Sequence, residues 1–382
     1  MSARTWRRIG VGTVVVLLVT VFGVVFGVAW YFSGVALAVV RDPEPRVTVR
    51  AVDGGTAIAL PPGDPTPDGR HAVRHPDGWG VLGDRVRGGG EEGPVVRDWG
   101  DVRGTLSADP VTAVVDQDAI VGDPSSVGLE FTDVMVTSEV GDLPTWLVPA
   151  DGTDTWVVFA HGRGGTREEA LRYLPLWHDL GHPVLVPSYR NDPGAPPDPD
   201  DRYGLGETEW RDVDAAVGYA LNNGAESVVL AGWSMGGAIV LQILDRSEHA
   251  GSVSGLVLDA PVVDWVDVLV HQGDQAGLPE WWSRFAVALV EVRGGLDFDD
   301  YDWVARAGDL PDEVPVYLVH SDGDTFVPNR RSLALAQARP DVVTLVRDST
   351  AEHTREWNVD PEAYEADMRE WFEQEIDPHD RR

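Results

Sequence analysis

The chain has 382 residues, enough for one large α/β domain with additional segments or for two ordinary domains. It carries 63 acidic residues against 30 basic ones, all of them arginine, and the formal net charge of −33 excludes a polyanion such as nucleic acid as an expected partner. Cysteine is absent, which excludes disulfides, thiolate metal sites and a cysteine nucleophile and leaves the redox compartment open.

The N-terminus predicts a membrane anchor. A basic segment, residues 1–8, precedes a run without charge, and we expect residues 9–33 to form a transmembrane helix. The run can cross the roughly 30 Å hydrocarbon layer, and aromatic residues stand where the interfaces would be, at Trp6, Trp30, Tyr31 and Phe32. The alternative is secretion after cleavage near Ala38, although a signal peptide usually has an apolar core of only about 7–15 residues.

The arginines around this span predict its orientation. Three arginines, at positions 4, 7 and 8, precede the span in a tight cluster, whereas those at 41, 46 and 50 follow it at wider spacing. The cluster and the free amino group favour an N-terminus inside the cell and a C-terminal domain outside.

Residues 41–126 are rich in Gly, Pro, Asp and Arg, with short β-like pieces at 47–52 and 56–60. Turn-forming runs such as 61–69 and 87–94 separate them. We expect a small β-rich or loop-rich stalk, to which the sequence assigns no function.

From residue 127 to 376 the pattern predicts a larger domain. Residues 134–140 and 143–148 read as a β-hairpin. Short apolar runs then alternate with helical stretches, which predicts a mostly parallel sheet covered on both faces. The expected strands are 156–160, 184–186, 227–231, 256–258, 316–319 and 342–346, and the expected helices are 167–180, 207–222, 235–244, 330–338 and 361–376. Residues 377–382 are a tail.

Ser234 lies where an expected strand turns into a helix, within Gly-Trp-Ser-Met-Gly-Gly. A G-x-S-x-G motif at such a turn holds a nucleophilic serine at the carboxyl edge of the sheet, and its glycines remove side chains that would clash. A packing turn with an incidental serine is the alternative.

A serine nucleophile needs a general base and an orienting carboxylate. Asp324 follows the strand 316–319 and His353 follows 342–346, so both are expected at the edge that carries Ser234. Asp322 and Asp259 remain alternative acids. His320 lies too close to its strand, and His161 belongs to another loop.

The oxyanion of a tetrahedral intermediate needs two N–H donors. The backbone N–H of Met235, directly after the serine, is the first, and that of Arg163 in the loop His-Gly-Arg-Gly-Gly is the expected second. A phosphate cradle is the alternative for this loop, but no lysine follows.

These motifs resemble the α/β-hydrolase superfamily, in its serine-aminopeptidase and lipase-like branch, over about residues 131–376. The resemblance implies an α/β-hydrolase fold and a membrane-anchored bacterial hydrolase without cofactor or metal. Its expected substrate is a small-molecule or lipid acyl compound, with ester cleavage favoured over peptide cleavage. Acyl transfer or peptide cleavage by the same residues, or a catalytically silent interaction domain, are the alternatives. The oligomeric state is left open.

The insert at 261–311 falls where this superfamily places a cap. Its aromatic residues either form an apolar acyl pocket or hold the cap together, and helical spacing does not separate the two. They are Trp265, Trp281, Trp282, Phe285, Phe298, Tyr301 and Trp303.

Overall fold

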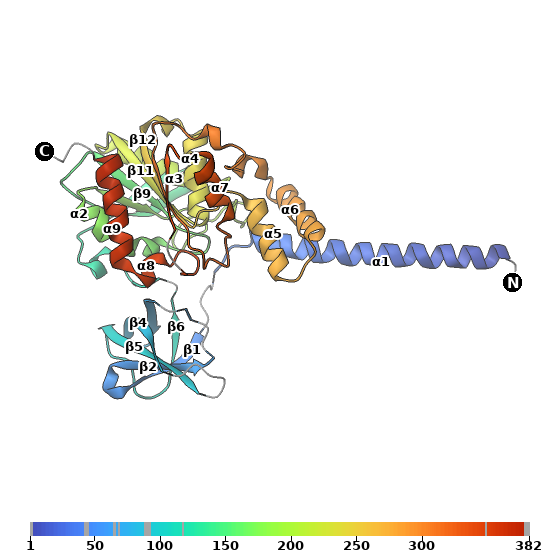
Figure 1. Ribbon diagram of the computed structural model, residues 1–382, viewed down its shortest axis with the longest axis horizontal. Helices are drawn as coiled ribbons and strands as arrows, with labels where there is room; N and C mark the ends of the chain where they lie inside the picture. Colours follow the sequence, from blue (N-terminus) through green and yellow to red (C-terminus); the bar gives the residue numbers. More distant parts are fainter. Residues whose placement is uncertain are drawn as a thin grey trace. The chain divides into compact units, whose positions relative to one another are not determined.

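The computed structural model describes residues 3–41, 46–63, 66–67, 69–87, 93–116, 118–347 and 350–377 (Figure 1). Its contacts divide the chain into two compact units, one made of Met1–Ala38 with Asp264–Asp302 and the other of Val39–Val263 with Trp303–Arg382. The side chains of the predicted basic segment, most of the predicted loop at 87–94 and the tail after Asp377 lie outside the described residues.

An eight-stranded sheet forms the centre of the second unit. Its order is β14-β13-β12-β11-β9-β10-β8-β7. β7 and β8 form an antiparallel hairpin, β8 is antiparallel to β10, and the six strands β9 to β14 are parallel to one another. The predicted hairpin and parallel sheet are therefore confirmed. The strands are β7 Thr132–Ser138, β8 Gly141–Val148, β9 Thr155–Ala160, β10 Val184–Pro187, β11 Ser227–Trp233, β12 Val253–Asp259, β13 Val316–Val319 and β14 Val343–Val346.

Helices cover both faces of this sheet (Figure 1). α3 (Glu209–Asn222) and α4 (Met235–Arg246) lie on one face, and α7 (Arg330–Ala338) packs on β14. On the other face, α2 (Leu174–Asp179), α8 (Glu356–Val359) and α9 (Pro361–Trp371) bury a cluster with alternate strand residues such as Val157, Phe159, Val229 and Ala231. Burial on both faces explains why the strands read as continuous apolar runs.

The predicted helix at 167–180 is interrupted. The structure has a 3₁₀ helix, Arg167–Arg172, followed by α2, whose second residue is Pro175. Proline lacks an N–H and clashes with the preceding turn, so it is accepted in the first turn of a new helix. The last helix continues beyond α9 to Ile376 as a π-helical turn.

The predicted β-rich region is a closed antiparallel barrel of six strands, in the order β1-β2-β5-β4-β3-β6. Its interior is filled by apolar side chains, with Ile58, Val73, Leu82 and Val95 fully buried. The barrel consists of β1 Arg46–Val52, β2 Ala57–Pro62, β3 His71–His75, β4 Gly78–Arg87, β5 Pro94–Arg103 and β6 Val111–Val115.

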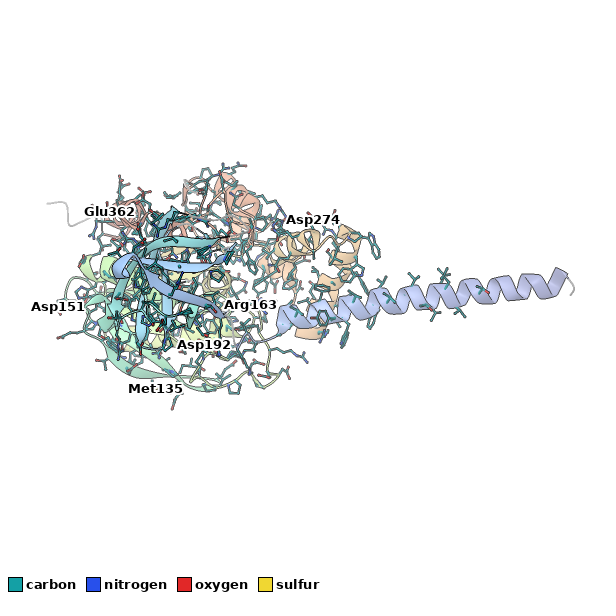
Figure 2. The ribbon with its side chains drawn as sticks, turned by 90° about the horizontal axis from the view of Figure 1, so that it is seen from below. Met135, Asp151, Arg163, Asp192, Asp274 and Glu362 are labelled. Carbon is teal, nitrogen blue, oxygen red and sulfur yellow. The ribbon has the colours of Figure 1, made fainter. Side chains whose placement is uncertain are left out.

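The first unit joins the N-terminal helix to the insert. α1 (Ala3–Leu37) contacts α6 (Glu280–Gly294), which also packs against α5 (Trp265–Gln275). The stretch from Val16 to Leu37 is apolar and long enough to cross a membrane. Most of the side chains of this stretch are exposed, and Figure 2 draws them as sticks along the helix.

Candidate active site

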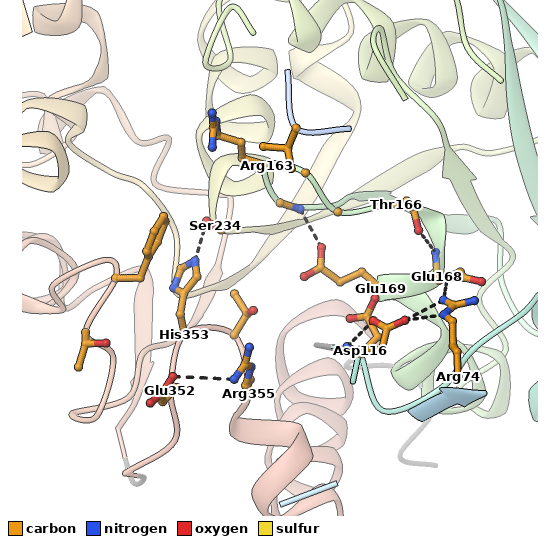
Figure 3. A pocket seen from close by; sticks show the side chains of 18 residues that line it. Arg74, Asp116, Arg163, Thr166, Glu168, Glu169, Ser234, Glu352, His353 and Arg355 are labelled. Carbon is orange, nitrogen blue, oxygen red and sulfur yellow. Dashed lines mark hydrogen bonds and ion pairs between the residues drawn. The ribbon is translucent and has the colours of Figure 1, made fainter. Parts of the chain in front are cut away.

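A cavity of about 510 Å³ lies beside the carboxyl ends of the parallel strands (Figure 3). Its lining includes three of the sequence-predicted site residues, Ser234, His353 and Arg163. Its wall carries charges of both signs, contributed by Arg74, Asp116, Asp118, Arg163, Glu168, Glu169, Glu352 and Arg355. Within the described ranges, no group of three or more His, Asp or Glu side chains converges as a metal site requires.

Ser234 occupies the turn between β11 and α4 in a strained conformation, with φ 53° and ψ −116°. Its N–H donates to the carbonyl of Asp259 at 3.0 Å, and its carbonyl accepts from Gly237 and Val262. Such φ values are uncommon for residues other than glycine and persist only where surrounding contacts impose them. The turn thus presents Ser234 Oγ to the cavity.

The glycines around Ser234 are required by close backbone approaches. A Cβ on Gly232 would lie 2.4 Å from the carbonyl oxygen of Gly236, and one on Gly236 would lie 2.0 Å from that of Ala160. Both distances are well below any van der Waals contact. The motif in the sequence therefore reflects tight packing of the turn against β9.

His353 bridges Ser234 and Asp324. Its Nε2 lies 2.7 Å from Ser234 Oγ, and its Nδ1 lies 2.7 Å from Asp324 Oδ2. The other oxygen of Asp324 accepts the N–H groups of Phe326 and Val327 at 2.8 and 2.9 Å. The carboxylate is thereby fixed toward the imidazole.

The surroundings of Asp324 keep it ionised. Burial alone would raise the pKa of this carboxyl, but hydrogen bonds and positive charge from His320 and His353 outweigh it and hold the pKa well below its usual range. His320 Nε2 lies 3.2 Å from Asp324 Oδ2. His320, which we did not expect to be the base, therefore contacts the same carboxylate oxygen as His353.

The two alternative acids have other partners. Asp322 is exposed and pairs with Arg347 at 2.6 Å. Asp259 is fully buried, and its Oδ2 accepts the hydroxyl of Tyr364 at 2.9 Å. Of the three carboxyls, Asp324 is therefore the one whose hydrogen bond to His353 the structure describes.

The loop expected to supply the second oxyanion donor is held by a carboxylate. Gly162 N–H donates to Glu169 Oε2 at 2.7 Å and is therefore already engaged. Arg163 and Gly164, the next two residues of the loop, also line the cavity. Sequence reasoning missed Glu169. Its position three residues after Thr166, whose hydroxyl accepts from Glu168 N, would assign it to an ordinary helix capping box instead.

His161 also holds this loop in place through its side chain. Its Nε2 lies 2.8 Å from Asp192 Oδ2, its Nδ1 lies 2.9 Å from the carbonyl of Gly162, and its ring stacks on Tyr189. Burial would lower the pKa of His161, but the charge of Asp192 outweighs it, and the net pKa is raised. Both ring nitrogens of His161 are thus engaged, one with Gly162 and the other with Asp192.

Arg172 is a second residue that the sequence did not reveal. Its buried guanidinium donates to the carbonyl of Thr354 at 3.0 Å and to Asn358 Oδ1 at 2.8 Å, and it lies 3.6 Å from Glu169. It therefore links the loop of His353 to the loop of Gly162. The contact joins residues 182 positions apart, for which the sequence holds no local signal.

Two buried carboxyls, Asp259 and Glu356, lie beneath the site. Burial raises the pKa of Asp259 to about 6, against the opposing effects of Tyr364 and Arg172. Burial and the charge of Asp259 raise the pKa of Glu356 well above its usual value. One oxygen of each, Asp259 Oδ1 and Glu356 Oε2, has no hydrogen-bond partner among the described residues.

Three aromatic residues of the insert pack against one another. Trp265 contacts Phe298 and Phe298 contacts Tyr301, and all three are buried. Among the described residues that line the cavity, two carry rings, Phe326 and His353, and both belong to the second unit.

Comparisons with known proteins agree on the larger domain. Residues 157–381 match the profile of the alpha/beta hydrolase family. The uncharacterized protein YqkD of Bacillus subtilis is 23% identical over 250 residues, covering 64% of this chain and 80% of that protein. Esterase Pf2001 of Pyrococcus furiosus superposes with a TM-score of 0.54 at 22% identity, over 67% of this chain and 96% of its own, and a second crystal form of it gives 0.52. Structural likeness at this identity shows a shared fold.

Proposed function

Because the chain belongs to the alpha/beta hydrolase family, we propose that it is a serine hydrolase that cleaves a carboxylic ester or related acyl bond. The observation that carries the proposal is the hydrogen-bonded chain from Ser234 Oγ through His353 to Asp324, with 2.7 Å at both links. Both distances lie within the reach that proton transfer requires. The esterase activity of a structural relative agrees with an ester substrate.

Each residue has one role in the proposed reaction. Ser234 Oγ attacks the acyl carbon while His353 Nε2 takes its proton, and Asp324 orients the imidazole and stabilises its positive charge. The proton then passes to the leaving alcohol, and an acyl-enzyme remains. Water, deprotonated by His353, releases the acid and restores the serine.

The oxyanion is stabilised by backbone donors. Met235 is the first residue of α4, so its N–H has no acceptor within the helix, and the helix N-terminus favours negative charge. Arg163 N–H is the proposed second donor, on a loop held by Glu169 and His161. Donors fixed in advance need no reorganisation as the charge develops.

The test is a Ser234→Ala variant with a short-chain p-nitrophenyl ester. We expect turnover to fall by about 10³-fold or more, with loss of covalent fluorophosphonate labelling at residue 234. Ser254→Ala is the matched control, because Ser254 makes only a 3.3 Å bond to the carbonyl of Val228. Unchanged turnover in Ser234→Ala would exclude this mechanism.

We also propose that α1 anchors the enzyme in a membrane with its N-terminus inside the cell and its catalytic domain outside. Its apolar stretch and the preceding arginines support this assignment. A C-terminal reporter active only outside the cytoplasm is the expected result. A reporter active only in the cytoplasm would reverse the topology, and protein released into the medium would support cleavage near Ala38.

A further inference from the structure

The outward face of α6 is apolar although it is exposed. Trp281, Phe285, Ala288 and Val292 recur at helical spacing along this face, and the exposed fractions of Trp281 and Val292 are 63% and 79%. The opposite face, with Trp282, Ser283, Ala286, Val287 and Val290, is buried. Apolar side chains gathered on an exposed face are typical of a surface that contacts a partner or a membrane.

This face continues the apolar surface of α1. Phe285 of this face packs against Phe26 with ring centroids 6.4 Å apart, while Trp282 of the buried face packs edge-on against Phe32 at 5.8 Å. Ala29 is fully buried in the same cluster. The two helices thus present one joined apolar surface to their surroundings.

Arg293 secures the contact at the other end of α6. Its guanidinium donates to the carbonyl of Trp30 and to Ser33 Oγ, and it lies 4.0 Å from the centre of the Trp30 ring. A positive charge over a tryptophan face stabilises the pair. α6 is therefore fixed to the last turns of α1.

The length of α1 places these turns at a membrane boundary. Its 35 residues extend about 52 Å, whereas a hydrocarbon layer of about 30 Å takes about 20 residues. A span that begins directly after Arg8 ends near Val28, within the stretch 25–37 that packs on α6 and its neighbours. α6 then lies where the span leaves the hydrocarbon.

The charges of α6 agree with an interfacial depth. Glu280 pairs with Arg284 near its start, and Glu291 and Arg293 stand near its end. If the span were instead 16–37, these charges would lie within hydrocarbon, which is costly. Trp30, Tyr31 and Trp281 are exposed, and exposed Trp and Tyr side chains are enriched at membrane interfaces.

We propose that the outward face of α6 rests in the lipid interface beside the anchor helix, so that the insert is a membrane-contacting element. The partner is the bilayer itself, contacted by Trp281, Phe285, Ala288 and Val292. The inference rests on the proposed membrane anchor. It does not depend on the catalytic residues.

The absence of cysteine allows a direct test on the full-length protein. Single variants Ala288→Cys and Val292→Cys, each labelled with an environment-sensitive dye, are reconstituted in phosphatidylcholine vesicles. The vesicles carry nitroxide lipids with the quencher either near the headgroup or near the chain centre. Turnover of a soluble ester by each labelled variant checks that it is folded.

Two matched positions serve as controls. Val19→Cys reports on the exposed, apolar part of α1, and Val359→Cys on an exposed valine of α8 in the other unit. We expect labels at 288 and 292 to lose most of their emission with the shallow quencher. The label at 19 should respond to the deep quencher, and the label at 359 to neither.

The outcomes separate the two hypotheses. Quenching at 19 without quenching at 288 and 292 would overturn the role of α6 and leave the anchor intact. No quenching at 19 would overturn the anchor itself. Equal quenching at 359 and 292 would show that lipid contact is not a property of α6, and would also overturn the proposal.

Discussion

Replacing Asp259 with asparagine should stabilise the protein at neutral and alkaline pH. The carboxyl is fully buried, and burial raises its pKa from 3.8 to about 6. Between these pH values the folded protein keeps a proton that the unfolded chain has lost, so the free energy of unfolding falls as the pH rises. Below pH 3.8 both states are protonated and the penalty vanishes.

The size of the effect follows from the shift. About two pKa units correspond to a penalty of about 3 kcal/mol that is complete above pH 6. Asparagine keeps an oxygen that accepts the Tyr364 hydroxyl, and it carries no charge. Removing the charge should also let Glu356 ionise more readily, because the charge of Asp259 raises the pKa of Glu356.

The assay is thermal unfolding of the detergent-solubilised protein across pH 4–8, together with ester turnover. We expect Asp259→Asn to melt several degrees above the parent at pH 8, at about 2–4 °C per kcal/mol, and to match it near pH 4. Asp322→Asn removes the same charge from an exposed position and should bring no gain. An Asp259→Asn variant no more stable at pH 8, or as inactive as Asp324→Asn, would refute this reasoning.

Three further substitutions test the site. Asp324→Asn should lower kcat by about 10³–10⁴-fold with the melting temperature measured alongside, because the imidazole loses the acceptor that sets its tautomer; retention of activity would point to another acid. Gly236→Ala places a Cβ 2.0 Å from the Ala160 carbonyl oxygen and should cost about 3 kcal/mol or more of unfolding free energy in urea titrations, whereas an unchanged midpoint would contradict the packing. Arg172→Met should lower the free energy of unfolding by about 3–5 kcal/mol, because nearby acidic side chains lose their cation and the Thr354 carbonyl loses its hydrogen-bond donor. A melting curve identical to that of the parent would show that this link is dispensable.

The sequence by itself determined the sheet and the turn at Ser234. Strands buried on both faces require continuous apolar runs, and the tight turn requires glycine at 232 and 236, so both leave a local pattern. Asp324 and His353 could be proposed because parallel strands end at one edge. The break before α2 was missed, although Pro175 stands in the sequence, because the apolar spacing continues across it.

Only the tertiary structure decided which carboxylate faces His353 and what holds the loop that contains Arg163. Asp322 and Asp324 follow β13 and Asp259 is the last residue of β12, and their side-chain directions depend on partners such as Arg347 and Tyr364 from distant segments. The same holds for Arg172, whose contacts span more than 180 residues. Likewise, the apolar residues of α6 and α1 each suggest burial, but their contact exists only after the chain has folded. Local composition encodes what a segment prefers to become, whereas the pairing of distant segments depends on how the whole chain packs.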